Sequence, residues 1–338
     1  MRHTSQLVIT LLFVSLIAGG LSIARAEEET VKIGFGTLKL GGVYQSTFTW
    51  YEDDALASQF KLKRARLILS GTLVPDKVTF FVQGDGAATP YILDTRLNLN
   101  YIPKTQLSIG RFVPSFTLYM PLSTAKLDFV NYPFTTSKFA MWRQTGMQST
   151  TTLPLVDFSF GVFNGYQTDP GSTTLKGDDW GDNNDAKDFL ARVDIKPLKQ
   201  MKFGLFGWLG QAYDSVEDED FDVSRFGFNW DWLHTKFHFA AEYVMGSVDY
   251  AATDSIDSMA YMVQGSYILN PAWEFLGRYE AFDPNTDSDD DAMDYFTAGF
   301  NYSIASINTK FFVNYIFKME EGDSIDNDEL VIQAQFSF

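Results

Sequence analysis

Basic residues recur at the polar positions of short segments that alternate apolar and polar side chains. Arg64 and Arg66 form the closest such pair, and Arg96, Arg192 and Arg278 occupy polar positions in other segments. In an extended chain, alternate side chains point to the same face, so these groups lie on the polar faces of their strands. Such side chains attract and filter anions, while carboxylates on the same face neutralise them. The sequence therefore indicates a charged polar surface carried on strands.

Residues that carry covalent catalysis are scarce. The chain has no cysteine and three histidines, of which His234 and His238 lie beyond the N-terminal segment. Neither stands beside a serine motif, so no nucleophile-and-base pair is indicated. The lack of cysteine excludes disulfides, Cys-based metal sites and a covalently attached haem. We therefore predict no enzyme, no catalytic residue, no metal ligand and no cofactor.

The N-terminal residues are typical of an export signal. Arg2 and His3 precede an apolar run over residues 7–18, and Ala24-Arg25-Ala26 offers a small-residue cleavage site. An anchoring helix fits less well, because the run is short and is followed by two glycines. We predict a signal peptide over residues 1–26 and a short periplasmic segment over residues 27–37.

The remaining residues, 38–338, form a succession of alternating segments. Each has about the 9–11 residues that a tilted strand needs to cross a membrane. The segments cover residues 38–50, 65–73, 77–85, 91–101, 105–112, 141–150, 155–166, 187–197, 201–213, 223–232, 235–246, 258–269, 272–282, 293–303, 306–318 and 328–338. This pattern predicts an all-β fold, an antiparallel up-and-down transmembrane barrel of about sixteen strands.

The connections between these segments alternate strictly between short and long. The short ones include residues 74–76 and 103–104, whereas the long ones, such as 283–292, are acidic. Short periplasmic turns opposite long external loops are the layout of a Gram-negative outer-membrane barrel. The net charge of −17 argues against a nucleic-acid partner. The acidic loops lack EF-hand spacing, and we expect them to meet divalent cations in the lipopolysaccharide layer.

The last segment places Phe336 and Phe338 on its apolar face. We expect both rings to face lipid while the last strand pairs with the first, which removes the sheet edges. An aromatic end on an alternating strand also resembles the signal read by the outer-membrane assembly machinery.

One connection is both the longest of the external connections and the least acidic of them, and it is a candidate for an inner loop. Residues 114–138 contain Lys126, Asp128 and Lys138, and Arg111 and Arg143 lie at the flanking strand ends. Three prolines and several aromatic residues suit a loop packed against an inner wall, although a loop folded over the rim is the alternative. A pore of sixteen strands needs such a loop to select by size and charge.

Several segments resemble the phosphate-selective porin O and P family. They are "FKLKRARLILSG" (60–71), "SIGRFVPSFTL" (108–118), "FGVFNGY" (160–166), "KDFLARVDIKPL" (187–198) and "NPAWEFLGRYEAFD" (270–283), and with later strands they span residues 60–338. The resemblance implies a sixteen-stranded porin, often trimeric, with one inward-folded loop. The loops of this chain are short for that family, and its acidic surface is not that of an anion collector.

Together these features predict a porin for passive diffusion of small hydrophilic solutes or ions, with anions such as phosphate favoured by the resemblance and by the inward arginines. The acidic composition leaves a cation-preferring general porin as an alternative, and a structural barrel that holds a partner protein is another. The predicted pore-lining or constriction residues are Arg64, Arg66, Arg96, Arg111, Lys126, Asp128, Lys138, Arg143, Arg192 and Arg278.

Deleting Phe338 is expected to lower the amount of folded barrel in membranes, because the terminal aromatic residue would be missing from the assembly signal. Heat-modifiable mobility on gels measures that amount. An unchanged yield of folded protein would contradict the expectation.

Overall fold

The computed structural model describes residues 30–33, 36–53, 55–168, 175–176, 181–182, 184–214, 218–250, 255–320 and 326–338. The predicted signal peptide, residues 1–26, lies outside these ranges. Within the predicted N-terminal segment, β1 (Thr30–Ile33) pairs antiparallel with the first residues of β2.

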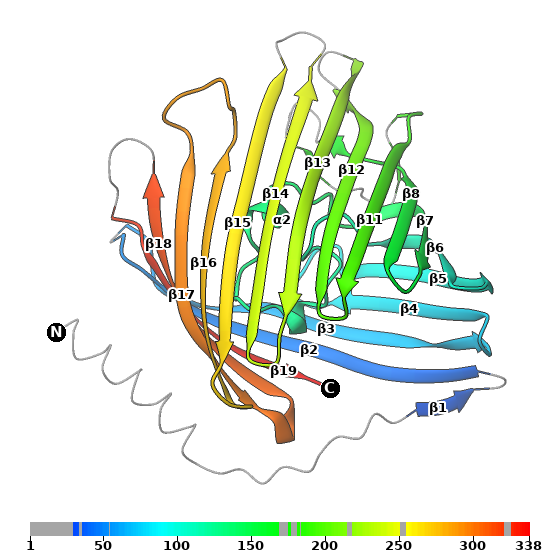
Figure 1. Ribbon diagram of the computed structural model, residues 1–338, viewed down its shortest axis with the longest axis horizontal. Helices are drawn as coiled ribbons and strands as arrows, with labels where there is room; N and C mark the ends of the chain where they lie inside the picture. The colour runs from blue at the N-terminus through cyan, green and yellow to red at the C-terminus, as the bar shows by residue number, and fades with distance from the viewer. Residues whose placement is uncertain are drawn as a thin grey trace.

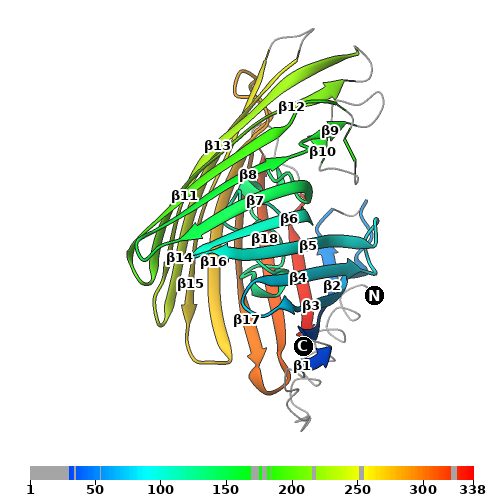
Figure 2. The same ribbon diagram turned by 90° about the vertical axis from the view of Figure 1, so that its right-hand side faces the viewer.

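In the described residues, sixteen strands pair in sequence order and close into one antiparallel barrel (Figures 1 and 2). Closure comes from the pairing of β19 with β2. The barrel strands are β2 (Gly36–Tyr51), β3 (Gln59–Val74), β4 (Val78–Asp85), β5 (Ile92–Ile102), β6 (Thr105–Phe112), β7 (Gln144–Thr152), β8 (Val156–Phe163), β11 (Asp188–Leu198), β12 (Met201–Asp214), β13 (Glu219–Leu233), β14 (Phe237–Asp249), β15 (Ile256–Ile268), β16 (Trp273–Asp283), β17 (Met293–Ile304), β18 (Thr309–Glu320) and β19 (Glu329–Ser337). Each predicted segment overlaps one of these strands, although several bounds differ by a few residues, and the closed antiparallel barrel confirms the predicted fold class.

A small two-stranded sheet of β9 (Gln167–Thr168) and β10 (Leu175–Lys176) lies in the connection between β8 and β11. No helix in the described part of the chain is both long and apolar enough to cross a membrane.

The strands keep the predicted alternation of apolar and polar faces. Outward positions such as Leu205, Phe228 and Val263 are more than half exposed, whereas Asn229 and Gln264 are buried inside the barrel. An apolar exterior around a polar interior is the reverse of a water-soluble protein. It is the arrangement of a barrel that is surrounded by lipid and encloses polar groups.

A β-bulge in β3 alters the alternation at one functional point. Gln45 of β2 pairs with Arg64 and Ser46 pairs with Leu62, so Lys63 is an extra residue without a partner. The Lys63 ammonium donates to the carbonyl of Val130 inside the barrel, at 2.8 Å. A bulge re-aims a side chain by one position, so Lys63 joins Arg64 on the inner face.

The connection between β6 and β7, residues 113–143, folds into the barrel. It contains the short helices η1 (Thr124–Lys126) and α2 (Phe134–Ser137), and α2 contacts β14, β15 and β16 on the opposite wall (Figure 1). Phe116 and Met141 are fully buried in a cluster with inward residues of the wall. The barrel therefore has a hydrophobic core, which lies between this segment and strands β11–β15. We call residues 113–143 the inner loop.

Gly110 lies in β6, where the backbone of β5 leaves no room for a side chain. Its φ is +131°, and a Cβ at this position would lie 2.2 Å from the carbonyl oxygen of Thr95 on β5. Gly110→Val is expected to lower the free energy of unfolding of the barrel by at least about 1–3 kcal/mol. A β-branched residue is strained at this φ, and its side chain would separate β6 from β5. Urea-induced unfolding in detergent measures the change.

Gly86→Ala is the matched control, because its Cβ would meet nothing closer than 3.8 Å. Equal unfolding midpoints for the two variants would contradict the role of Gly110.

Candidate functional site

Side chains of the barrel wall hold the inner loop by its backbone. Buried main-chain groups need hydrogen-bond partners, and this loop lacks a strand neighbour to supply them. Inward side chains of the wall supply these hydrogen bonds. The pairs, each with the wall side chain first and the loop residue whose backbone it contacts second, are Gln45–Thr124, Lys63–Val130, Glu242–Leu118, Glu280–Phe134, Arg192–Phe116, Arg278–Asn131, Asn301–Asp128, Asn314–Val130 and Gln335–Ala125. These contacts come from β2, β3, β11, β14 and β16–β19, so the loop is held against that part of the wall along much of its length.

Asp128 provides a further anchor through its side chain. Its carboxylate lies 3.1 Å from His238 Nδ1 on β14 and accepts from Gln264 Nε2 at 2.8 Å. His238 Nε2 also lies 2.7 Å from the Asp231 carboxylate on β13. The imidazole thus bridges two carboxylates and ties the middle of the inner loop to the wall. The single carboxylate of the loop is engaged there.

A cavity of about 710 Å³ lies between the inner loop and strands β3–β7. It reaches the short turns at Lys104 and Thr152, so we call it the turn-side cavity. Four basic side chains line it, against a single carboxylate, that of Asp94. They are Arg66, Arg96, Lys104 and Arg143.

A second cavity, of about 380 Å³, lies nearer the long loops and is lined by Lys63, Arg64, Arg278 and Lys318 with two glutamates. We call it the loop-side cavity. The glutamates pair with Arg278 and Lys318, at 2.8 and 2.5 Å. Tyr132 of the inner loop lines both cavities, and the Arg64 guanidinium lies 5.8 Å from its ring centroid. The two cavities therefore adjoin at Tyr132.

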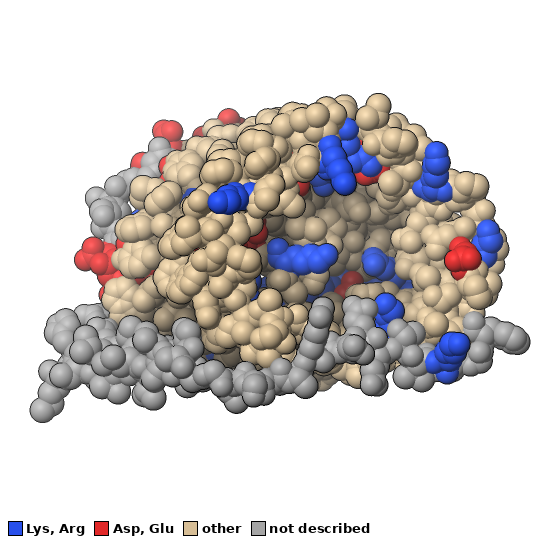
Figure 3. Space-filling view, turned by 60° about the horizontal axis from the view of Figure 1, so that its bottom comes forward, with Lys and Arg blue, Asp and Glu red and all other residues tan. Residues whose placement is uncertain are grey.

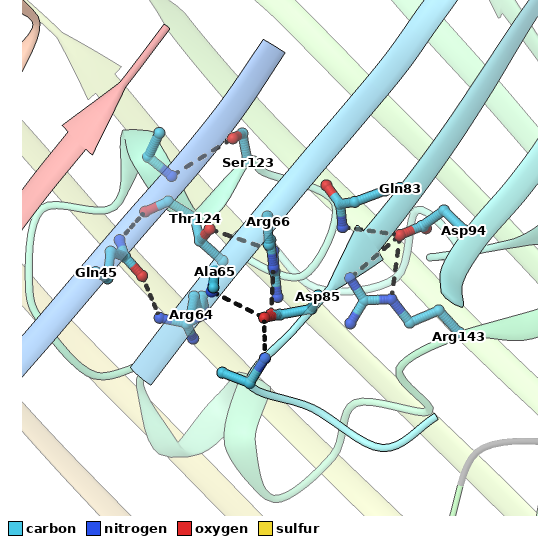
Figure 4. Close-up of polar contacts among 12 residues, drawn as sticks. Gln45, Arg64, Ala65, Arg66, Gln83, Asp85, Asp94, Ser123, Thr124 and Arg143 are labelled. Atoms are coloured by element: carbon cyan, nitrogen blue, oxygen red, sulfur yellow. Dashed lines mark hydrogen bonds and ion pairs between the residues drawn. The ribbon is translucent and has the colours of Figure 1, made fainter. Parts of the chain in front are cut away.

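Arg64 lines the loop-side cavity and Arg66 lines the turn-side cavity. Figure 4 shows the polar contacts of both side chains. Arg66 pairs with Asp85 at 3.0 Å and donates to the hydroxyl of Thr124 in the inner loop. Arg64 donates to the side-chain oxygen of Gln45, at 2.7 Å. Among the described residues no carboxylate forms an ion pair with Arg64, which lines the loop-side cavity beside Tyr132.

Arg143 and Arg96 lie farther along the turn-side cavity. Arg143 pairs with Asp94 at 3.3 Å (Figure 4). The Arg96 guanidinium lies 5.0 Å from the ring centroid of Phe81 and 5.7 Å from that of Phe112. In the part of the chain that the structure describes, Arg96 has neither an ion pair nor a hydrogen bond, and its Nε is buried without a partner.

The structure places the other predicted site residues around the inner loop rather than in the turn-side cavity. Arg192 pairs with Asp194 at 2.7 Å and is buried where it donates to the loop backbone. Arg111 is buried and donates to the carbonyl of Leu93. Arg278 has both roles, since it holds the loop and lines the loop-side cavity.

Two lysines of the inner loop are exposed. Lys126 lies in η1, and the Lys138 ammonium lies 4.8 Å from the ring centroid of Phe282. At the chain end, Phe336 and Phe338 are 42% and 50% exposed on the outer face. The backbone of Phe338 also exchanges two hydrogen bonds with Gly42 of β2.

Sequence reasoning missed Lys63 and the glutamine at position 45. Strict alternation assigns Lys63 to the lipid face, and only the bulge brings it inside. The run Lys61–Arg66 contained a usable signal. A lysine at a lipid-facing position costs a few kcal/mol, so a charge on each face of one short segment indicates a local irregularity.

The turn end of the barrel is hollowed, and lysine and arginine side chains surround the hollow more densely than carboxylates do (Figure 3). Lysines at or beside the short turns include Lys77, Lys104, Lys199 and Lys236. Within the described residues, no group of three or more His, Asp or Glu side chains is arranged to hold a metal ion.

Comparison with known proteins finds similarity to porins. A family model described as phosphate-selective porin O and P matches residues 210–338. This match confirms the predicted resemblance over these residues, while the segments before residue 210 lie outside it. A search of curated protein sequences finds no match.

Solved structures with a similar fold are bacterial porins and channels. OmpT of Vibrio cholerae in a trimer form is 12% identical, with a TM-score of 0.66, over 90% of this chain and 100% of that chain. An anion-selective porin from Comamonas acidovorans is 12% identical, with a TM-score of 0.67 and the same coverage. The outer-membrane channel DcaP of Acinetobacter baumannii is 14% identical, with a TM-score of 0.67, over 90% and 97%. The chain thus has the fold of a sixteen-stranded porin barrel.

Asp128→Ala is expected to loosen the inner loop, because it removes the partner of His238 and Gln264 while leaving the barrel pairing intact. Loss of such buried partners should speed amide exchange in the loop about 5- to 100-fold. Hydrogen exchange followed by mass spectrometry of loop peptides measures this rate.

Asp157→Ala is the control, since Asp157 pairs with Lys196 at 2.6 Å next to a short turn. Unchanged exchange in the loop of Asp128→Ala would show that the backbone contacts alone fix it.

Proposed function

We propose that the chain is an outer-membrane porin through which small hydrophilic anions diffuse passively. The path runs through the loop-side cavity, past Tyr132 and into the turn-side cavity. Lys63 and Arg64 line its first part, and Arg66 and Arg96 line its second.

The observation that carries the proposal is the charge balance along this path. No ion pair joins Lys63, Arg64 or Arg96 to a carboxylate within the described residues. Asp128, the one acidic residue of the inner loop, is bound to His238 on another part of the wall. Uncompensated positive charge at the narrowest part of a pore lowers the barrier for anions and raises it for cations.

The comparisons support this proposal without deciding the solute. The matched family is described as phosphate-selective, and one structural neighbour is described as anion-selective. We extend the outer-membrane location and the porin activity to this chain on the basis of its barrel fold and apolar exterior. The trimer form of one neighbour supports a homotrimer as the proposed assembly.

A cation-preferring porin is the second candidate. The net charge of −17 and carboxylates such as Asp287, Asp289 and Asp290 at a long loop favour it, because they raise the local concentration of cations. Salt screens these exposed groups over about 8–10 Å, whereas the arginines beside the path act on the ion directly. Anion preference is therefore the stronger expectation.

The reversal potential of single channels in a planar bilayer under a KCl gradient tests the proposal. The wild-type barrel should favour Cl⁻. The Arg64→Gln and Arg66→Gln double variant should lower the Cl⁻/K⁺ permeability ratio at least about fivefold, since each unit charge 4 Å from an ion in water contributes about 1 kcal/mol and acts on Cl⁻ and K⁺ with opposite sign.

Lys199→Gln removes one positive charge at a short turn and should leave the ratio nearly unchanged. K⁺ preference in the wild-type barrel would favour the second candidate. Absence of current from folded protein would reject both and leave a structural barrel.

A further inference from the structure

The inner loop presents an apolar surface to the turn-side cavity. Its apolar lining side chains are Val113, Met120, Pro121, Leu122, Tyr132 and Trp142, and Ser115, Ser123 and Arg143 of the loop line the cavity beside them. Leu122 is 39% exposed although it lies inside the barrel, where outward lipid contact cannot account for it. A hydrated inorganic ion gains nothing from such a surface, whereas an apolar group is transferred to it favourably.

Two aromatic rings give this surface a defined shape. The rings of Tyr132 and Trp142 pack edge to face with centroids 5.3 Å apart. Trp142 has a φ of +50°, a conformation that is uncommon for a bulky residue. Backbone strain of this kind persists only where the surroundings enforce it, and here it accompanies an indole ring beside the cavity.

Arg96, on the barrel wall, lines the cavity and forms no ion pair within the described residues. Its guanidinium is held by the rings of Phe81 and Phe112, and within the described residues no acceptor satisfies it. A guanidinium fork binds a planar carboxylate through two parallel hydrogen bonds. Arg143, which also lines the cavity, adds positive charge that Asp94 only partly offsets.

We propose that the turn-side cavity selects aromatic carboxylates among the anions that pass. The carboxylate binds Arg96, and the ring of the solute lies against Tyr132, Trp142 and Leu122. The inference rests on the proposed pore function and narrows its substrate class. A small number of polar groups in a largely apolar lining is how small-molecule sites combine affinity with orientation.

Block of single-channel KCl current by sodium benzoate, acetate and phosphate tests the proposal. Benzoate should reach half-block at a concentration about five- to tenfold lower than acetate, because only benzoate contacts the aromatic surface. Phosphate should be weaker than benzoate. Equal half-blocking concentrations for benzoate and acetate, or stronger block by phosphate, would overturn the inference while leaving the porin function intact.

Variants separate the two parts of the site. Trp142→Gly removes the indole and suits the positive φ, and Leu122→Ser makes the loop surface polar. Each should move the half-block by benzoate toward that of acetate. Arg96→Gln should weaken block by both carboxylates. Phe203→Leu on the outer face and Lys202→Gln, which lines neither cavity, are the controls for ring and charge.

Binding of benzoate to the folded protein in detergent, measured by titration calorimetry, provides a readout that needs no current. Binding that Arg96→Gln and Trp142→Gly both reduce would support the site even if the barrel does not conduct. Benzoate binding that is absent, or equal in wild type and both variants, would reject it.

Discussion

The need to satisfy the backbone of the inner loop governs the interior of this barrel. A segment that enters the lumen carries main-chain donors and acceptors but has no neighbouring strand to pair with. The wall supplies the missing partners through inward side chains. Glu242, Glu280 and Asn314 each accept a hydrogen bond from a backbone amide of the loop. These hydrogen bonds fix the position of the loop relative to the wall. Its position then decides which part of the lumen stays open and which side chains face it.

The same requirement divides the charged residues of the lumen into two groups. Arg192 and Arg278 donate to loop carbonyls and form ion pairs with nearby carboxylates. Their positive charge is therefore neutralised locally, and the two side chains hold the loop. Removing one partner of such a buried pair leaves the other uncompensated, which is costly. Arg64 and Arg96, on the open side, have no such pairing among the described residues. The field along the path therefore comes from few residues, although the lumen contains many charges.

Asymmetry across the turn-side cavity is the second consequence of the loop's position. One side is barrel wall with polar and basic groups such as Arg66 and Arg96, and the other is loop with Leu122, Tyr132 and Trp142. Because the loop's only carboxylate is bound to His238, the loop offers no negative charge to oppose the wall. Arg96 on the wall and the rings of Tyr132 and Trp142 on the loop thus face the same cavity, with Arg143 at the end of the loop. The proposed preference for anions and the proposed preference for solutes with an aromatic ring therefore arise in the same cavity.

The sequence by itself determined the barrel. Period-two alternation in segments of membrane-spanning length, with short and long connections in turn, predicted each strand and which face of it is polar, because a strand's faces follow directly from residue spacing. It also singled out residues 114–138 as the candidate inner loop. Only the tertiary structure decided which arginines line the path and which hold the loop. That choice depends on contacts between residues far apart in sequence, such as Arg192 with Phe116. The bulge at Lys63 was likewise decided by pairing with β2, since one extra residue reverses the face that alternation assigns.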